Sequence, residues 1–202
     1  MSEWWTYRPS DFLMFSPRTY LRLVELYNGE VWPAHALAMA AGLAAIGLAA
    51  ARGALAWRTI AVLLALAWLW VGWAFHWQRY ASINWAAKYL AAAFLVQAAL
   101  LLAAAAMPQL AAPAFRRTGM QRLGLAMATA GVLFYPLAGW AVGRPWTQAE
   151  VFGIAPEPTA LATLGLLLAA GPFRSHPVRA ALGAIPLLSL LLGIATLWVM
   201  AG

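Results

Sequence analysis

Six long apolar segments constrain this chain more than any other feature of its sequence. They lie at about 31–51, 57–76, 85–106, 121–142, 158–173 and 178–201. Most are close to 20 residues long, and a helix of about 20 apolar residues crosses the roughly 30 Å hydrocarbon layer of a bilayer. The sequence therefore predicts an all-α polytopic integral membrane protein, a bundle of six transmembrane helices.

The composition supports a membrane protein and excludes several classes of site. The chain is 64% hydrophobic and 9% charged, whereas soluble domains are about 25% charged. Its net charge of +7 comes mostly from arginines between the apolar segments, which indicates topology and predicts a lipid bilayer as partner but no nucleic acid. The absence of cysteine excludes disulfides, thiolate metal sites and iron–sulfur clusters.

Residues 1–30 form a separate amphipathic segment before the six-helix bundle of 31–202. Ser16 and Pro17 are favourable residues for a helix start, and Gly29 is a favourable stop. Apolar and charged residues alternate at helical spacing, with Leu21, Val24 and Tyr27 on one side and Arg18, Arg22 and Glu25 on the other. We expect either an interfacial helix or a helix packed on the end of the bundle. The first five residues do not match a cleavable signal peptide, so we expect this segment to be retained.

The connections between the segments divide the charges unequally. Connections 52–58, 107–122 and 172–179 carry seven arginines and no acid, whereas the opposite side carries six basic residues and all six acids. Cytoplasmic connections are enriched in Lys and Arg. The acid-free side is therefore predicted to be cytoplasmic, with both termini on the non-cytoplasmic side.

The stretch 75–89 is the densest polar run between two apolar segments. If the second helix continues to Tyr80, then His76, Arg79 and Tyr80 share one face, and Asn84 and Lys88 share a face of the third helix. Two interpretations remain open. The run is either a cationic pocket for an anion or polar solute, or an interfacial anchor whose Arg and Lys side chains reach the headgroups.

Lys88 is the residue for which a partner of opposite charge is most strongly expected. It lies one turn inside the third apolar segment, and a charge at the centre of a membrane costs roughly 2.5–3.5 kcal/mol, less near the end of a helix. We therefore predict an ion pair between Lys88 and Glu150 or Glu157. Gln97, near the middle of the same segment, is a deeper polar group.

The connection 144–159 is the second candidate region. Pro156 and Pro158 are predicted to prevent regular helix before the fifth segment, and Thr159–Phe173 would extend only about 22 Å. A loop that enters the membrane before the helix would complete the crossing, as in interrupted transporter helices. Thr159 and Thr163 would line it. The alternative is a surface loop followed by a short tilted helix, and the sequence leaves open whether 151–158 enter the membrane.

Two stretches, Trp4–Phe12 and Glu150–Gly165, resemble an uncharacterised family of small bacterial multi-pass membrane proteins, classed as a domain of unknown function. The resemblance covers nearly the whole chain. It implies a bacterial inner-membrane protein with about six helices, and it supplies no catalytic residues.

Three functions follow from these observations as hypotheses. The first is a small bacterial inner-membrane transporter or channel-like protein for a small ion or polar solute, which forms a homo-oligomer. Its binding site would lie in the outward half and consist of His76, Arg79, Asn84, Lys88, Gln97, Glu150 and Glu157. The second is a membrane-embedded enzyme or a metal- or haem-binding protein that uses His35 and His76, although only carboxylates would complete a metal shell. The third is a non-catalytic subunit or sensor whose N-terminal helix docks a partner.

Overall fold

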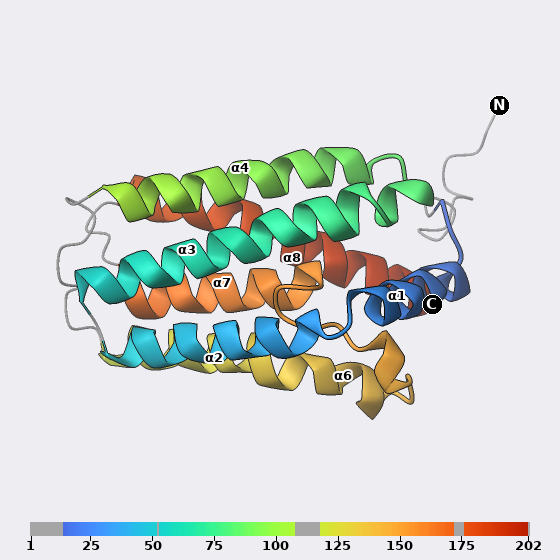
Figure 1. The fold of residues 1–202 in the computed structure, drawn as a ribbon, viewed down its shortest axis with the longest axis horizontal. Coiled ribbons are helices and arrows are strands. Elements are labelled where there is room, and N and C mark those ends of the chain that lie inside the picture. The colour runs from blue at the N-terminus through green and yellow to red at the C-terminus, as the bar shows by residue number, and fades with distance from the viewer. Residues whose placement is uncertain (1–13, 52, 108–117, 172–175, 202) are drawn as a thin grey trace, which may run out of the picture.

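The computed structural model describes residues 14–51, 53–107, 118–171 and 176–201. Every regular element in this part of the chain is helical, as predicted. Long helices lie side by side, and the short helix α1 packs across one end of the bundle (Figure 1). The C-terminal end of α8 lies at the same end of the bundle as α1.

The helices follow the apolar segments closely. Their bounds are α1 Pro17–Val31, α2 Ala34–Ala51, α3 Ala54–Trp70, α4 Ala87–Ala106, α5 Thr118–Thr129, α6 Tyr135–Ala141, α7 Pro156–Ala170 and α8 His176–Ala201. Short elements join or extend them, namely the π-helices η3 Val71–Trp77 and η6 Ala130–Phe134 and the 3-10 helices η4 Tyr80–Ser82 and η7 Trp146–Gln148. The π-helical turn η6 lies just before Pro136, where a missing N–H and a ring clash disturb the regular helix.

Five stretches of the described chain are long and apolar enough to cross a membrane, which is compatible with a multi-pass membrane protein. They are Ala34–Ala51, Ala54–Ser82, Ala87–Ala106, Gly119–Ala141 and Pro177–Met200. The sixth predicted span, α7, has 15 residues and falls short of this length. It is buried along most of its length and contacts α2, α3, α5 and α8, so it is a core helix enclosed by the longer ones.

The N-terminal helix α1 packs on the end of the bundle. The side chain of Ser16 accepts a hydrogen bond from the backbone N–H of Thr19 at 3.1 Å, and Pro17 occupies the first turn, as predicted. Tyr20, Val24, Tyr27 and Asn28 are buried. The predicted stop at Gly29 is wrong, because the helix continues to Val31. It ends where Pro33 disfavours helical backbone in the residue before it.

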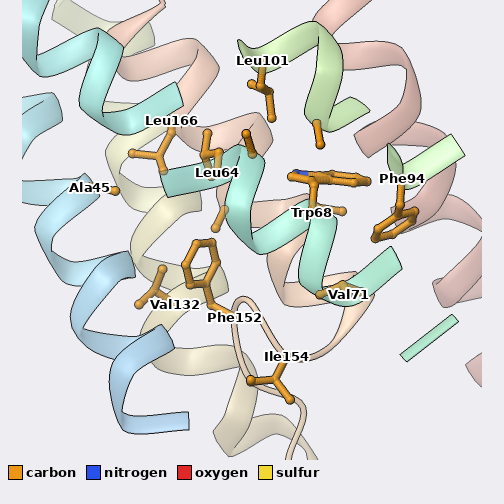
Figure 2. Packing of buried hydrophobic residues seen from close by; sticks show 14 of the residues in the cluster. Ala45, Leu64, Trp68, Val71, Phe94, Leu101, Val132, Phe152, Ile154 and Leu166 are labelled. Atoms are coloured by element: carbon orange, nitrogen blue, oxygen red, sulfur yellow. The ribbon is translucent and has the colours of Figure 1, made fainter. Parts of the chain in front are cut away.

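The loop before α7 is part of the core. Val151–Ala155 are buried, and Figure 2 shows Phe152 and Ile154 of this loop pointing among the helices. Two backbone N–H groups, of Ile154 and Ala155, bond to the carbonyl of Val151. Gly153 has a φ of +73°, a backbone conformation that favours glycine. The loop is therefore buried among the helices and is not a surface loop, and its entry into the membrane stays a prediction.

The start of α7 differs from the prediction. The helix begins at Pro156, so both prolines lie in its first turn, where backbone N–H groups have no helical partner and proline is tolerated. The side chain of Thr159 accepts a hydrogen bond from the N–H of Gly153 at 2.8 Å, so Thr159 lines the loop as predicted. Thr163 instead accepts a bond from the indole of Trp68 at 2.9 Å.

Candidate functional site

A cavity of about 40 Å³ lies where α1, η3, α4, α7 and α8 meet. Its polar lining consists of Tyr20, His76, Tyr80, Glu157, Ser189 and Thr196. One water needs about 10–15 Å³ of such volume. The cavity therefore has room for about three waters or for one small ion with part of its hydration.

Glu157 enters the cavity from the first turn of α7. It is buried, and its Oε2 has no hydrogen-bond partner. A carboxylate at a helix N-terminus is favoured by the backbone dipoles, but that position does not satisfy the second oxygen. Gly193 of α8 makes room for the side chain, because a Cβ there would lie 2.7 Å from Cδ of Glu157. The Glu157 side chain thus lies against the backbone of α8 at Gly193, and its Oε2 has no hydrogen-bond partner.

His76 faces the same cavity from the π-helical turn η3. It is buried, and neither ring nitrogen has a hydrogen-bond partner. The ring packs edge-on against Phe94, with centroids 4.5 Å apart. Gly72, one turn earlier, lets α4 approach closely, since a Cβ there would lie 2.9 Å from Cβ of Phe94. A buried polar group without a partner costs about 1–3 kcal/mol, so a ligand or water that bonds to the ring nitrogens of His76 in the cavity would stabilise this arrangement.

Glu150 lies beside the cavity in the loop after η7 and is buried. The Tyr20 hydroxyl donates to Oε1 of Glu150 at 3.5 Å, and Nη2 of Arg144 lies 3.6 Å from its Oε2. Burial raises the pKa of Glu150 above its usual 4.5, and the Arg144 guanidinium opposes that rise. Gly139 supports Arg144, because a Cβ there would lie 3.1 Å from the guanidinium.

Glu150 and Glu157 are close enough to repel each other electrostatically, and Arg144 acts on both. Tyr20 and Tyr135 also interact with both carboxyl groups. With both glutamates ionised, the cluster would hold two negative charges against one guanidinium. An uncompensated charge in a dry interior is costly, so this arrangement favours one further positive charge, a proton or a small cation.

Three residues of the predicted site lie on the rim and are not part of this cluster. Arg79 is exposed and pairs with Glu30. Asn84 accepts a hydrogen bond from the N–H of Ala86 at 3.0 Å, at the start of α4. Lys88 is exposed, and its Nζ lies 5.6 Å from the centre of the Trp77 ring. These contacts fit interfacial anchoring.

The structure does not form the predicted ion pair of Lys88 with Glu150 or Glu157. Lys88 is on the outer side of α4, where it gains a cation–π contact with Trp77. Arg144, six residues before Glu150 in the same connection, takes the place opposite that carboxylate. Of the seven predicted site residues, the structure brings together His76, Glu150 and Glu157.

Gln97 and His35 lie elsewhere. Gln97 is buried between α4 and α8, where its Nε2 donates to the carbonyl of Leu182 at 3.0 Å and its Oε1 has no partner. His35 Nε2 is 3.2 Å from Oδ1 of Asn28, and His35 is not among the residues that line the cavity of His76. Within the described ranges, no group of three His, Asp or Glu side chains is arranged to hold a metal ion.

Sequence reasoning missed Tyr20, Gly193, Ser189 and Thr196, which complete the cavity. The position of Tyr20 on the apolar side of an amphipathic helix was a weak indication that it would be buried at the bundle. Nothing in the sequence indicated the three α8 residues, since small and hydroxyl residues in an apolar helix have many structural uses.

A family model describing a family of unknown function, DUF6064, matches residues 18–200. The chain belongs to the DUF6064 family. The match includes every residue of the cavity and of the carboxyl cluster, whereas the stretch Trp4–Phe12 lies outside both the match and the described residues. No curated protein and no solved structure shows significant similarity to the chain.

Replacement of Arg144 by Gln should destabilise the protein in a pH-dependent way. The folded-state pKa of Glu150 already exceeds its unfolded value, so stability falls as the pH rises from 4.5 through that raised pKa. Without Arg144 the pKa rises further, and the loss extends to higher pH. We expect less than the roughly 3–5 kcal/mol of a fully buried pair, because the Arg144 side chain is 19% exposed.

The measurement is the midpoint of thermal unfolding in detergent, from acidic to mildly alkaline pH. Arg22→Gln is the control, because Arg22 forms an exposed pair with Glu25 and such pairs contribute about 0–1 kcal/mol. A deficit for Arg144→Gln that is the same at every pH would contradict the assigned pairing.

Proposed function

We propose that this chain is a small bacterial inner-membrane transporter or channel-like protein for a small cation, with its binding site at the cavity of Glu157 and His76. One observation carries the proposal. Glu157 Oε2 and both ring nitrogens of His76 are buried without partners, and the two side chains line the same cavity. Ionisable groups inside a membrane protein are costly, and they commonly mark ion pathways.

The dimensions and charge of the site support a small cation over a larger solute. A cavity of about 40 Å³ is far smaller than the roughly 300–1,000 Å³ of pockets that enclose drug-sized molecules. Two carboxyl groups face one guanidinium in the cluster, which favours a positive occupant. Arg79, Asn84 and Lys88 anchor the rim at the membrane surface in this proposal and do not contact the ion.

The depth and position of the site support the same function. The loop Val151–Ala155 and the short helix α7 place Glu157 inside a shell of longer apolar helices, in the way that interrupted helices place binding groups in transporters. The cavity lies toward the end of the bundle at which α1 packs. By the distribution of charges in the connections, we assign this end to the non-cytoplasmic side.

Substitution of Glu157 by Gln should abolish ion flux. The test uses purified protein in liposomes, an imposed membrane potential and a panel of H⁺, Na⁺, K⁺ and Li⁺. We expect flux of at least one cation above empty liposomes, and Glu157→Gln should return it to that background, because the amide keeps the shape of the side chain but loses its charge.

Two variants serve as matched controls. Glu25→Gln removes a carboxylate from the exposed pair with Arg22, and Lys88→Ala removes a rim cation; both should keep wild-type flux. Flux that is unchanged by Glu157→Gln would refute the site. The absence of flux for every cation of the panel would refute the transport function.

A further inference from the structure

We propose that the cation bound at this site is a proton, held on Glu157 and exchanged with the α1 end of the bundle through Tyr20 and Glu150, with Arg144 as the counter-ion of Glu150. This inference rests on the transport function proposed above and specifies its ion. It is carried by the lining of the cavity, by the charge of the cluster and by the contacts of Tyr20.

The side chains of the lining supply at most six oxygens, the lower limit for a hard metal cation, and only the two of Glu157 can carry charge. Hard cations such as Mg²⁺ and Ca²⁺ take about six to eight oxygen ligands. Here one carboxyl group and four hydroxyl groups share the wall with apolar groups, and the Thr196 hydroxyl already donates to the carbonyl of Leu192 at 2.8 Å. The apolar part of the wall comes from Phe75, Leu90, Phe94, Pro156, Leu192 and Gly193. A proton needs only one lone pair at a time. Oε2 of Glu157 and the imidazole ring of His76, which both lack hydrogen-bond partners, can each provide one.

The charge of the cluster is balanced when Glu157 carries the proton. Arg144 is then positive, Glu150 negative and Glu157 neutral, so the sum is zero. Transfer of the proton breaks the O–H bond of Glu157 and forms an O–H bond on Glu150, with the Tyr20 hydroxyl accepting one proton as it donates its own to Glu150. The products are the Glu157 carboxylate and the neutral Glu150 carboxyl group, so the charge of the cluster is unchanged and no other reactant is needed. Burial disfavours a lone charged carboxylate, so the neutral acid is the resting form.

Tyr20 connects the cavity to Glu150. Its ring lines the cavity, and its hydroxyl donates to Oε1 of Glu150. Burial and the two carboxyl groups raise the pKa of Tyr20 well above 10.0, so its hydroxyl keeps its proton and can donate and accept in a relay. Glu150 in turn faces Arg144, which is 19% exposed and reaches the surface of the protein.

The groups that face Glu157 come from every neighbouring element. The titratable or charged ones are Tyr20 of α1, His76 of η3, Tyr80 of η4, Tyr135 of α6, and Glu150 and Arg144 of the loop between α6 and α7. The lining of the cavity from α4 is apolar, and α8 adds the hydroxyls of Ser189 and Thr196. Arg144 is therefore the one permanent cation among these described groups, which leaves the second carboxyl to be neutralised by a proton.

Infrared difference spectroscopy of the full-length protein in lipid tests the proton directly. We expect a protonated-carboxyl band at neutral pH that is absent in Glu157→Gln, shifted in Glu157→Asp and unchanged in Glu25→Gln. The Asp variant keeps the test valid if the Gln variant does not fold. Absence of a band that depends on residue 157 would overturn the inference. The flux experiment is separate, so transport of Na⁺ or K⁺ by a protein without this band would leave the proposed function standing.

Hydrogen–deuterium exchange of the same band tests the path. Tyr20→Phe removes the linking hydroxyl and should slow exchange several-fold without removing the band. Tyr27→Phe is the matched control, because this second buried tyrosine of α1 donates to the carbonyl of Ile154 and lies outside the path. Equal exchange rates in the two variants would overturn the assignment of Tyr20 as the link.

Discussion

Replacement of Gly165 by Ala should prevent α7 from packing on α5 and should be among the most destabilising single-methyl additions in the described chain. A Cβ at Gly165 would lie 2.6 Å from the carbonyl oxygen of Gly124 and 2.9 Å from Cα of Ala128. These are backbone atoms, so no side-chain rotation relieves the contact. Extra methylene groups in a packed core typically cost about 1–3 kcal/mol, occasionally more, and a backbone obstacle places this variant at the upper end.

The measurement is the midpoint of thermal unfolding in detergent, with size-exclusion chromatography to detect loss of the folded form. Gly119→Ala is the matched control in α5, because a Cβ there meets no atom within 4 Å. Alanine is favoured over glycine in a helix by about 1 kcal/mol, so the control should be neutral or stabilising. A Gly165→Ala protein as stable as this control would refute the close crossing of α5 and α7.

Replacement of Gly193 by Ala should displace the Glu157 carboxyl group and thereby eliminate ion flux. A Cβ at this position would lie 2.7 Å from Cδ of Glu157, so the carboxyl group would have to move from its place in the wall of the cavity. We expect destabilisation of about 1–3 kcal/mol from overpacking together with flux at the background of empty liposomes.

A double-mutant cycle isolates this contact. In a Glu157→Ala background the carboxyl group is absent, so the added methyl of Gly193→Ala should cost little, and the two substitutions should show a coupling energy of about 0.5–3 kcal/mol. Gly183→Ala on the same helix is the control, because its nearest neighbour is Cδ2 of Leu164 at an ordinary 3.9 Å. Additive effects of the two substitutions would refute the predicted collision.

The two glycine contacts explain how an apolar bundle holds an open polar site. Gly124 and Gly165 allow α5 and α7 to cross closely, as expected for small residues between membrane helices, which places the first turn of α7 deep in the bundle. Gly193 then lets the Glu157 side chain lie flat against α8. Gly124 and Ala128 are small residues four positions apart in α5, and both lie against Gly165.

Local chemistry alone determined the course of the helices. Apolar length and the Ser16–Pro17 start of α1 are encoded in neighbouring residues, so their consequences could be predicted without the fold. The two wrong predictions of helix ends, at Gly29 and before α7, also have local causes. Gly29 does not stop α1, which continues to Val31 and ends before Pro33, and α7 begins at Pro156 because proline is acceptable in a first turn.

The composition of the site was decided by tertiary structure. Lys88 looked like the natural partner of Glu150 because both are polar residues predicted for the same end, but the rotation of α4 turns Lys88 outward to Trp77, and Arg144 faces Glu150 instead. His76 and Glu157 line one cavity only because η3 and α7, far apart in the sequence, both open onto it beside Gly193 of α8. The hydropathy of a sequence indicates how deep in the bundle a residue lies. It does not indicate the rotation of each helix about its axis, and that rotation decides which groups lie next to each buried charge.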